Sequence, residues 1–353
     1  MAFTSIDDPS AYFQTLLYTG NASARSLTND GNSNLQPDWV WTKKRNEAQN
    51  HCVTDSTRGV GNILFPDVND AESATQLLTS FDSDGFSINN NALVNDNSDT
   101  YVAWQWKANG GTTSSNTSGT ITSTVQANTT AGFSIVTYTG NNTDGATFGH
   151  GLGAVPHFIT IKKRGNAGNW MTYHQNLGED KAVFLDLANA TESSSFYQET
   201  PTSTLVTLNN HGNVNANSET YVAYCFSEIQ GFSKFGGYTG NGDNDGTFQF
   251  TGFQPAWLMI KRTDSSTNGN WWIHDTKRDV FNVGSRTLKA DTNATEVNSS
   301  DQYVDLFSNG FKLRNGNNSQ NGSGATYIYA AFAGRPMVTS TGTPTTGGVI
   351  KLT

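Results

Sequence analysis

The stretch Gly132-Phe-Ser-Ile-Val-Thr-Tyr-Thr-Gly-Asn141 indicates the fold class. Its first part alternates apolar and polar residues, which predicts a half-buried strand, and its Tyr-Thr-Gly-Asn end supplies turn residues. Downstream, Thr147-Phe-Gly-His-Gly-Leu-Gly153 leads to Pro156-His-Phe-Ile-Thr-Ile-Lys-Lys-Arg164. This last segment predicts a second strand, opened by a proline that needs no ladder donor. Together they predict a small β-module.

The unit recurs, in altered form, three times along the chain. Tyr-Thr-Gly-Asn appears at 18–21, 138–141 and 238–241, each time after an upstream Phe. A Pro-x-aromatic segment with a basic pair follows each copy, and each unit closes on a similar strand: 100–106, 220–226 and 326–332. Each unit has the size of an independent domain. We therefore predict three tandem β-sandwich modules at 1–110, 111–230 and 231–336, the first with an N-terminal arm, and a C-terminal arm at 337–353.

Almost every segment is short, alternating and bounded by Gly, Asn, Asp or Pro, which is typical of an all-β sandwich or jelly roll. Residues 70–79 are rich in Ala, Glu, Gln and Leu and predict a short helix or a turn. Residues 120–126 predict a strand, with an edge position as one option. Residues 108–116 read as a Gly/Ser/Thr linker. The arms, residues 1–10 and 337–353, are expected to become ordered by pairing with neighbours.

Composition narrows the function classes. Charged residues make up 14% of the chain, against about 25% in average proteins. The formal net charge is −9 and no long basic run exists, which argues against sequence-independent nucleic-acid binding. No apolar run reaches the ~18 residues of a membrane span, and the N-terminus has no secretory-signal pattern. Of the two cysteines, Cys225 is predicted as a buried thiol, with no disulfide to Cys52.

The repeated segments resemble a module of tailed-phage structural proteins, common in marine phages and cyanophages. The resemblance rests on 132–140, 149–153, 220–226, 231–241, 251–264 and 308–314, and on the opening Ile6-Asp-Asp-Pro-Ser-Ala-Tyr-Phe-Gln14. It covers nearly the whole chain. It implies a virion protein, often tail- or fibre-associated, with a concanavalin-like or jelly-roll β-sandwich. The family offers no catalytic residues to carry over.

The residues themselves indicate little catalytic chemistry. Nucleophile-elbow, phosphate-loop and His-Glu-x-x-His patterns are absent from the sequence, and so is Cys-x-x-Cys. We expect no enzyme, no cofactor and no metal. The Asx-Gly loops at 82–85, 142–145 and 243–246 read first as hairpin turns, with calcium as the alternative. The six histidines are dispersed, and His174 and His274 are interpreted as packing residues or, alternatively, as binding residues. No pair stands out among four candidate glycosidase carboxylates: Glu179, Asp180, Asp186 and Glu192.

Aromatic residues give the best functional hint, because eight tryptophans are many for this chain. Trp39 and Trp41 share one strand face, and so do Trp104 and Trp106, which favours packing. Trp271 and Trp272 cannot both point inward on a regular strand, so one should face a neighbour, a ligand or solvent. The candidate glycan or interface contacts are Trp170, Tyr173, Trp271, Trp272 and His274.

We therefore expect a non-enzymatic structural component of a bacteriophage virion, most readily tail-associated as a fibre or tail appendage. It would be made in the host cytoplasm, released by lysis, and assembled as a homo-oligomer, a trimer being one option, with other phage tail or capsid proteins as partners. One alternative is a lectin-like receptor-binding protein for host surface polysaccharide, and another is a capsid decoration protein. An enzyme acting on that polysaccharide is the third hypothesis. Nucleic-acid partners and membrane insertion are not expected.

Overall fold

The computed structural model describes residues 3–193, 196–197 and 199–345. Antiparallel sheets dominate, and in these ranges the only α-helices are two of four residues each, α1 (Ala92–Asn95) and α2 (Gly212–Asn215). Two 3-10 turns add η1 (Pro9–Ala11) and η2 (Ser300–Gln302). The predicted all-β class is confirmed. Within the described ranges no helix has the length and apolar character that crossing a membrane requires.

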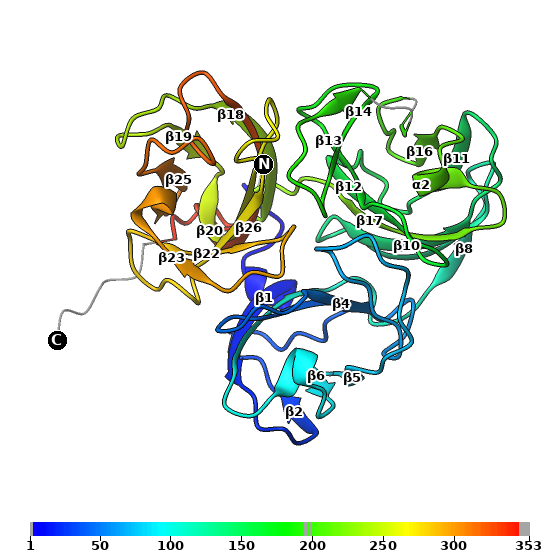
Figure 1. The fold of residues 1–353 in the computed structure, drawn as a ribbon, viewed down its shortest axis with the longest axis horizontal. Helices are drawn as coiled ribbons and strands as arrows, with labels where there is room; N and C mark the ends of the chain where they lie inside the picture. The colour runs from blue at the N-terminus through cyan, green and yellow to red at the C-terminus, as the bar shows by residue number, and fades with distance from the viewer. Residues whose placement is uncertain (1–2, 194–195, 198, 346–353) are drawn as a thin grey trace.

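Figure 1 shows three lobes, each built on one large sheet. The same four-strand arrangement recurs: the strand that carries the Tyr of Tyr-Thr-Gly-Asn pairs with the closing strand, then come the Pro-x-aromatic strand and one more. In spatial order, the sheet of lobe 1 is β1 (Phe13–Thr19), β7 (Thr100–Trp106), β3 (Trp39–Lys44), β4 (Cys52–Asp55). The sheet of lobe 2 is β15 (Glu192–Ser193), β14 (Lys181–Phe184), β13 (Met171–His174), β12 (Phe158–Lys163), β17 (Thr220–Phe226), β10 (Phe133–Thr139), β9 (Ser123–Asn128), β8 (Ser114–Asn116). The sheet of lobe 3 is β18 (Ser233–Thr239), β26 (Thr326–Pro336), β20 (Phe253–Arg262), β21 (Trp271–Asp275), β22 (Arg286–Lys289), β23 (Val297–Asn298).

A small sheet accompanies each large one. In lobes 1 and 2, side chains of the large and the small sheet share one apolar cluster, so each lobe has a core of its own. In lobe 3 the corresponding side chains merge with the cluster at the centre of the molecule. The small sheets are β2 (Arg25–Leu27), β6 (Gly85–Ile88), β5 (Leu78–Asp82) in lobe 1; β11 (Ala146–Gly149), β16 (Leu205–Leu208) in lobe 2; and β19 (Phe248–Phe250), β25 (Gly310–Leu313), β24 (Val304–Phe307) in lobe 3.

The Tyr-Thr-Gly-Asn motif builds the same corner three times. In lobe 2, Tyr138 stacks on Tyr221 across the strand pair at 5.1 Å between ring centroids, and its hydroxyl donates to a backbone carbonyl. The backbone N–H of Asn141 donates to the buried side chain of Asn215. Gly140 is required because an added Cβ would lie 2.4 Å from a backbone oxygen. Lobes 1 and 3 repeat these bonds through Asn95 and Asn321.

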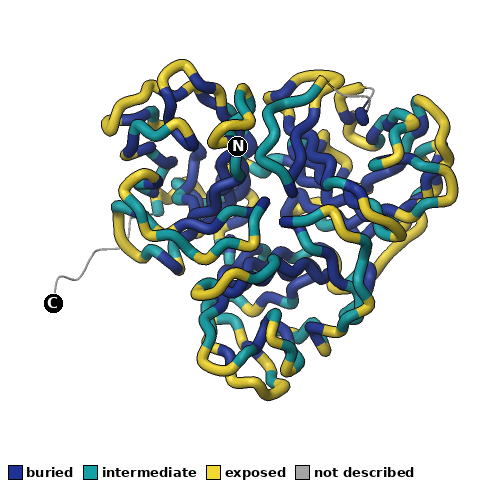
Figure 2. Tube along the Cα trace, in the orientation of Figure 1, coloured by how far each residue is buried: buried dark blue, intermediate teal, exposed yellow. Residues whose placement is uncertain are grey.

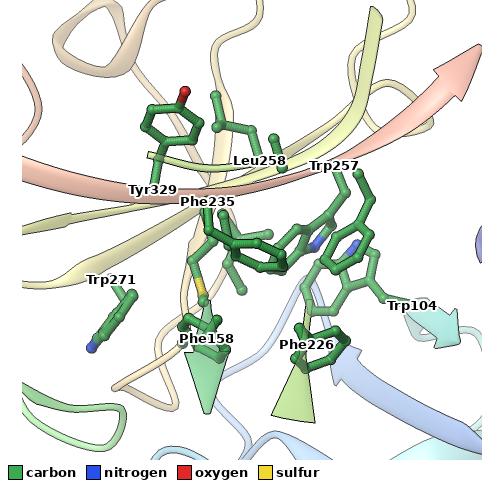
Figure 3. Packing of buried hydrophobic residues seen from close by; sticks show 14 of the residues in the cluster. Trp104, Phe158, Phe226, Phe235, Trp257, Leu258, Trp271 and Tyr329 are labelled. Atoms are coloured by element: carbon green, nitrogen blue, oxygen red, sulfur yellow. The ribbon is translucent and has the colours of Figure 1, made fainter. Parts of the chain in front are cut away.

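The outer faces of the three large sheets meet in one central aromatic core. Figure 2 shows the buried segments converging where the lobes join, and Figure 3 shows side chains of all three lobes packed together there. Trp104 of lobe 1 lies edge-on to Trp257 of lobe 3, with ring centroids 6.5 Å apart. Phe226 of lobe 2 lies 6.1 Å from Phe235 of lobe 3. The three lobes therefore close into a ring around apolar contacts that a single module would leave exposed.

Two local predictions need correction. Residues 70–79 form neither the helix nor the turn: apart from a bridge between Ser73 and Ile63 the chain is irregular until β5 begins at Leu78, because Glu72 is drawn into contacts between lobes 1 and 2. The strand predicted at 120–126 begins at Ser123 and is not at the edge, since β9 lies between β10 and β8.

The predicted linker and arms are held by the body of the chain where the structure describes them. In the 108–116 stretch, three backbone N–H groups donate to the Asp38 carboxylate. Near the N-terminus, Ile6 is buried in the central core. Beyond the last strand, the N–H of Met337 donates to the carbonyl of Gly252 at 3.1 Å. Residues 346–353, the end of the predicted C-terminal arm, lie outside the described residues.

Candidate functional site

The five predicted glycan or interface residues lie inside the molecule. Their side chains contact other parts of the chain and present no face to a soluble glycan, so a glycan role does not suit these positions. The expectation that one of Trp271 and Trp272 faces a neighbour, a ligand or solvent is met only within the chain, since both are buried: Trp271 reaches lobe 2, whereas Trp272 packs under the Lys289 ammonium at 4.7 Å. The exposed fractions are 0% for Trp170, 3% for Tyr173, 0% for Trp271, 7% for Trp272 and 2% for His274.

Two of these residues belong to a repeated set of contacts between lobes. The indole N–H of Trp170 donates to the carbonyl of Phe65 in lobe 1 at 2.9 Å. That of Trp271 donates to the carbonyl of Phe184 in lobe 2 at 2.7 Å. At the junction between lobes 1 and 3, the ring nitrogen Nε2 of His51 lies 3.0 Å from the carbonyl oxygen of Lys289. Each lobe thus binds the preceding one through the same position, and the ring closes.

A buried charge cluster sits at two of the three junctions. Between lobes 1 and 2, the carboxylate of Asp55 accepts from the Arg58 guanidinium at 2.6 Å and from the Tyr224 hydroxyl at 2.7 Å. Between lobes 3 and 1, Asp275 accepts in the same way from Arg278 and from the indole N–H of Trp104. Both Asp–Arg pairs are fully buried.

The junction between lobes 2 and 3 does not have this charge cluster. The equivalent positions hold His174, Leu177 and Ala330. Nε2 of His174 lies 3.1 Å from the carbonyl oxygen of Tyr329, and Nδ1 accepts from the N–H of Asn176. Burial lowers the pKa of His174 to about 4, so the ring stays neutral and bonded on both sides.

Shifted lysines and aspartates are also repeated in every lobe. Burial lowers the pKa of each lysine at the first basic-pair position to about 8: Lys43, Lys162 and Lys261. Burial raises the pKa of the facing carboxylates, to about 7 for Asp67 and about 6 for Asp186, and also that of Asp291. Each of these carboxylates accepts the backbone N–H of the residue in its own lobe that contacts the preceding lobe: His51, Trp170 and Trp271. Because all three lobes share them, we interpret these groups as structural.

Several of the carboxylates and loops considered for catalysis or calcium are engaged in contacts within the chain. Asp186 is one of the repeated structural carboxylates, and the Asp82 loop accepts from two serine hydroxyls. Asp245 pairs with Lys312 at 2.6 Å. Among the described residues no group of three or more His, Cys, Asp or Glu side chains could hold a metal ion.

His211 and the cysteines take structural positions too. His211 caps α2 by accepting the N–H of Asn213. Cys225 is a buried thiol with no disulfide to Cys52, as predicted, and Cys52 is buried as well. Burial raises the pKa of Cys225 to about 12.

An exposed aromatic face distinguishes lobe 3 from the other two. It lies on the outer side of its small sheet, where Phe250, Gly310 and Phe307 stand side by side and Phe248 lies next to Lys312. The rings of Phe248 and Phe307 are 6.2 Å apart, and the ring of Phe248 lies over Gly310, where a Cβ would come within 2.9 Å of it. The exposed fractions are 43%, 54% and 37% for Phe248, Phe250 and Phe307.

The same register positions in lobe 1 carry polar residues. Ser26 pairs with Ser87, Asp82 pairs with Gly85, and Thr28 packs beside Gly85. In lobe 1, Ser26, Thr28 and Asp82 therefore stand where lobe 3 has its three phenylalanines. The aromatic face is not a requirement of the fold. Aligning the repeats shows phenylalanines in lobe 3 where lobe 1 has polar residues. The sequence-based prediction relied on the tryptophans instead and did not include this face.

A loop beside the aromatic face adds two more exposed apolar side chains. Val280 and Phe281 are 71% and 72% exposed. Asn282 holds the loop on β24, since its side chain both donates to and accepts from the backbone of Leu306. A pocket of about 440 Å³ lies between this loop and the strand. We call Phe248, Phe250, Phe307, Val280 and Phe281 the aromatic face of lobe 3.

A polar groove of about 660 Å³ lies on the other side of the same loop. Tyr303 supplies its one aromatic side chain, with Asn244 and Asn315 as polar neighbours. The Arg314 guanidinium lies 3.4 Å from the Asp305 carboxylate. The groove therefore combines an aromatic ring, amides and an ion pair, the groups with which proteins orient polar ligands.

A family model for a domain of unknown function, DUF7483, matches residues 8–336. The chain belongs to the DUF7483 family. The match takes in all three lobes and not one repeat alone. The comparisons with curated proteins and with solved structures gave no match.

Proposed function

We propose that this DUF7483 protein is a non-enzymatic structural component of a bacteriophage virion, tail-associated, that assembles as a homo-oligomer. The observation that carries the proposal is the aromatic face of lobe 3. Soluble monomers rarely expose large contiguous apolar patches, and those that do use them for binding. Its absence from the equivalent face of lobe 1 indicates that it serves assembly with another chain rather than the stability of a lobe.

The architecture that goes with this function is three tandem β-sandwich modules of jelly-roll or concanavalin-like type. The repeated strand order, the repeated corner around Tyr-Thr-Gly-Asn and the separate cores of lobes 1 and 2 support it. Fused modules leave the lobe–lobe faces already occupied within one chain. Assembly with further chains must then use another surface, and the aromatic face offers one.

Light scattering of the purified protein tests the assembly, and labelling tests the location. We expect a homo-oligomer that persists on dilution. Antibodies to the protein should decorate the tails of particles purified from the lysate of the host that carries the gene. A monomer at all concentrations would contradict self-assembly, and particles without label would contradict the virion location.

The second candidate is a lectin-like receptor-binding protein for host surface polysaccharide, and the polar groove of lobe 3 favours it. Aromatic stacking on Tyr303 and hydrogen bonds from Arg314 and the amides are interactions that sugars use. A glycan array tests it: binding that is lost in Tyr303→Ala and kept in Tyr12→Ala would support a lectin, and turnover of the bound glycan would indicate an enzyme instead.

A further inference from the structure

In lobe 2, a short segment of the chain covers the outer edge of β11, the edge strand of the small sheet. Residues between β8 and β9 run along β11. Ile121 forms a parallel bridge with Phe148, and its N–H donates to the carbonyl of Thr147 at 2.8 Å. The N–H of Thr147 donates to the Thr120 hydroxyl, and the Ser123 hydroxyl donates to the carbonyl of Gly149. The outward backbone groups of β11 are thus satisfied by a short extended segment.

Lobe 3 has the same edge without that cover. β19 occupies the position of β11, and in the described chain it pairs on one side only, with β25. The chain just before lobe 3 is too short to supply such a segment, because only residues 227–232 separate β17 from β18. The side chains that flank the open edge are Phe248 and Phe250, where lobe 2 has Thr147 and Gly149. An exposed apolar edge strand is a template for pairing with another chain, and proteins normally blunt such edges.

The segment that could fill this edge exists at the end of the chain. Gly119-Thr-Ile-Thr-Ser123 follows the closing strand of lobe 1, and Gly348-Val-Ile-Lys-Leu352 follows the closing strand of lobe 3. Ile121 comes 15 residues after Trp106, and Ile350 comes 18 residues after Phe332. The first segment continues into β9 of lobe 2, and the second lies outside the described residues. In the described small sheets, β2 of lobe 1 is also paired on one side only, but Ser26 stands there where β19 has Phe248, so β19 is the open edge flanked by exposed aromatic side chains.

We propose that residues 348–352 of a second copy of this chain pair with the outer edge of β19 and cover the aromatic face of lobe 3. The inference rests on the proposed self-assembly and names the surfaces that would carry it. A second copy is the occupant because one strand at the edge covers only Phe248 and Phe250. Phe307, Val280 and Phe281 lie farther across the face and need the body of a neighbour.

The position of the chain end favours a closed dimer. Thr345 hydrogen-bonds to Met337, which is bonded to Gly252, two residues beyond β19. The remaining eight residues span at most about 28 Å when extended. Residue 345 therefore lies on the same side of the molecule as β19, and two copies related by a twofold axis could exchange the residues that follow it reciprocally.

The first test compares three proteins by light scattering. They are the full chain, a chain ending at residue 345, and a variant with Phe248→Ser, Phe250→Thr and Phe307→Asp. Lobe 1 carries these three polar residues at the same positions, so the variant should fold, and circular dichroism and thermal unfolding check that it does. The expected result is a dimer for the full chain and monomers for the other two. As a matched control, Ser26→Ala in lobe 1 should leave the dimer intact.

The second test measures the contact directly. A fluorescent synthetic peptide of residues 342–353 is titrated into the chain that ends at residue 345. We expect binding that weakens at least tenfold when the chain also carries the three polar substitutions, or when the peptide carries Ile350→Asp.

The outcomes separate this inference from the proposed self-assembly. A face variant that remains oligomeric while the truncated chain dissociates would overturn the acceptor site and leave self-assembly standing. A monomeric full chain, with a peptide that binds the truncated chain, would mean that the segment binds its own molecule and would overturn the second copy. A monomeric full chain with no peptide binding would overturn both ideas.

Discussion

Replacing Asp55 with alanine should destabilise the junction between lobes 1 and 2. Asp55 accepts from the Arg58 side chain at 2.6 Å, from the Arg58 backbone N–H at 2.8 Å and from the Tyr224 hydroxyl at 2.7 Å. Both side chains of the ion pair have no exposed surface. The substitution removes one of the carboxylates that pair with the buried Arg58 guanidinium, and water cannot reach the site to take the place of that carboxylate.

The size of the loss in stability depends on the partner that Arg58 retains after the substitution. Removing one partner of a buried ion pair costs about 3–5 kcal/mol. Arg58 retains Glu72, whose carboxylate lies 2.7 Å away and is partly exposed. We therefore expect the lower end of that range, a fall of about 3 kcal/mol in the free energy of unfolding. Urea unfolding followed by tryptophan fluorescence measures it, since Trp39 stacks on Tyr224 at this junction.

Two controls make the reasoning refutable. Asp264→Ala removes a carboxylate that pairs with Arg262 at the surface, and it should cost about 0–1 kcal/mol. Asp55→His combined with Arg58→Leu installs the uncharged pair that lobe 2 has at His174 and Leu177. This double variant should lose no more than about 1 kcal/mol, because replacing a whole buried pair is often neutral. A single variant that loses under about 1 kcal/mol, or a double variant as unstable as the single one, would refute a stabilising role for this charge pair.

Three further predictions concern single positions. Gly140→Ala should cost at least about 2 kcal/mol in thermal unfolding because its Cβ meets a backbone oxygen, whereas Gly61→Ala, which meets nothing within 4 Å, should be neutral. The folded pKa of His174, about 4, lies below its unfolded value, so its contribution to stability is full above pH ~6.5 and is lost as pH falls. The stability difference between wild type and His174→Gln should therefore shrink by about 2 kcal/mol between pH 7 and pH 5, and a constant difference would contradict the neutral ring. Cys52 and Cys225 should resist a thiol reagent in the native protein and react with it in urea. If the native protein reacted as fast as an exposed thiol does, the lobes would have to open.

The local structure was predictable because the repeated motifs are short-range. Tyr138-Thr-Gly-Asn141 specifies a strand and its corner through its own hydrogen bonds, and the closing strands alternate as strands do. The closed ring was not predictable in the same way. Trp104 and Trp106 share a strand face, but alternation cannot say whether that face meets its own small sheet or a neighbouring lobe.

The candidate site was missed for a related reason. Tryptophan content directed attention to Trp170 and Trp271, whose indoles are large enough to join the lobes and are therefore buried. The exposed aromatic residues are phenylalanines such as Phe248, in a short strand with no distinctive motif. Only the comparison with Ser26 at the same register position marks Phe248 as unusual, and that comparison needs the repeats aligned residue by residue.

The closed ring also changes how its junctions can evolve. Three separate copies of one lobe would form identical junctions, so any substitution would act three times at once and a harmful one would be removed by selection. In a single chain each junction is encoded separately. The junction with His174, Leu177 and Ala330 has uncharged packing where its two sister junctions have a buried charge pair. A single chain can thus combine a ring of three similar lobes with junctions that differ from one another.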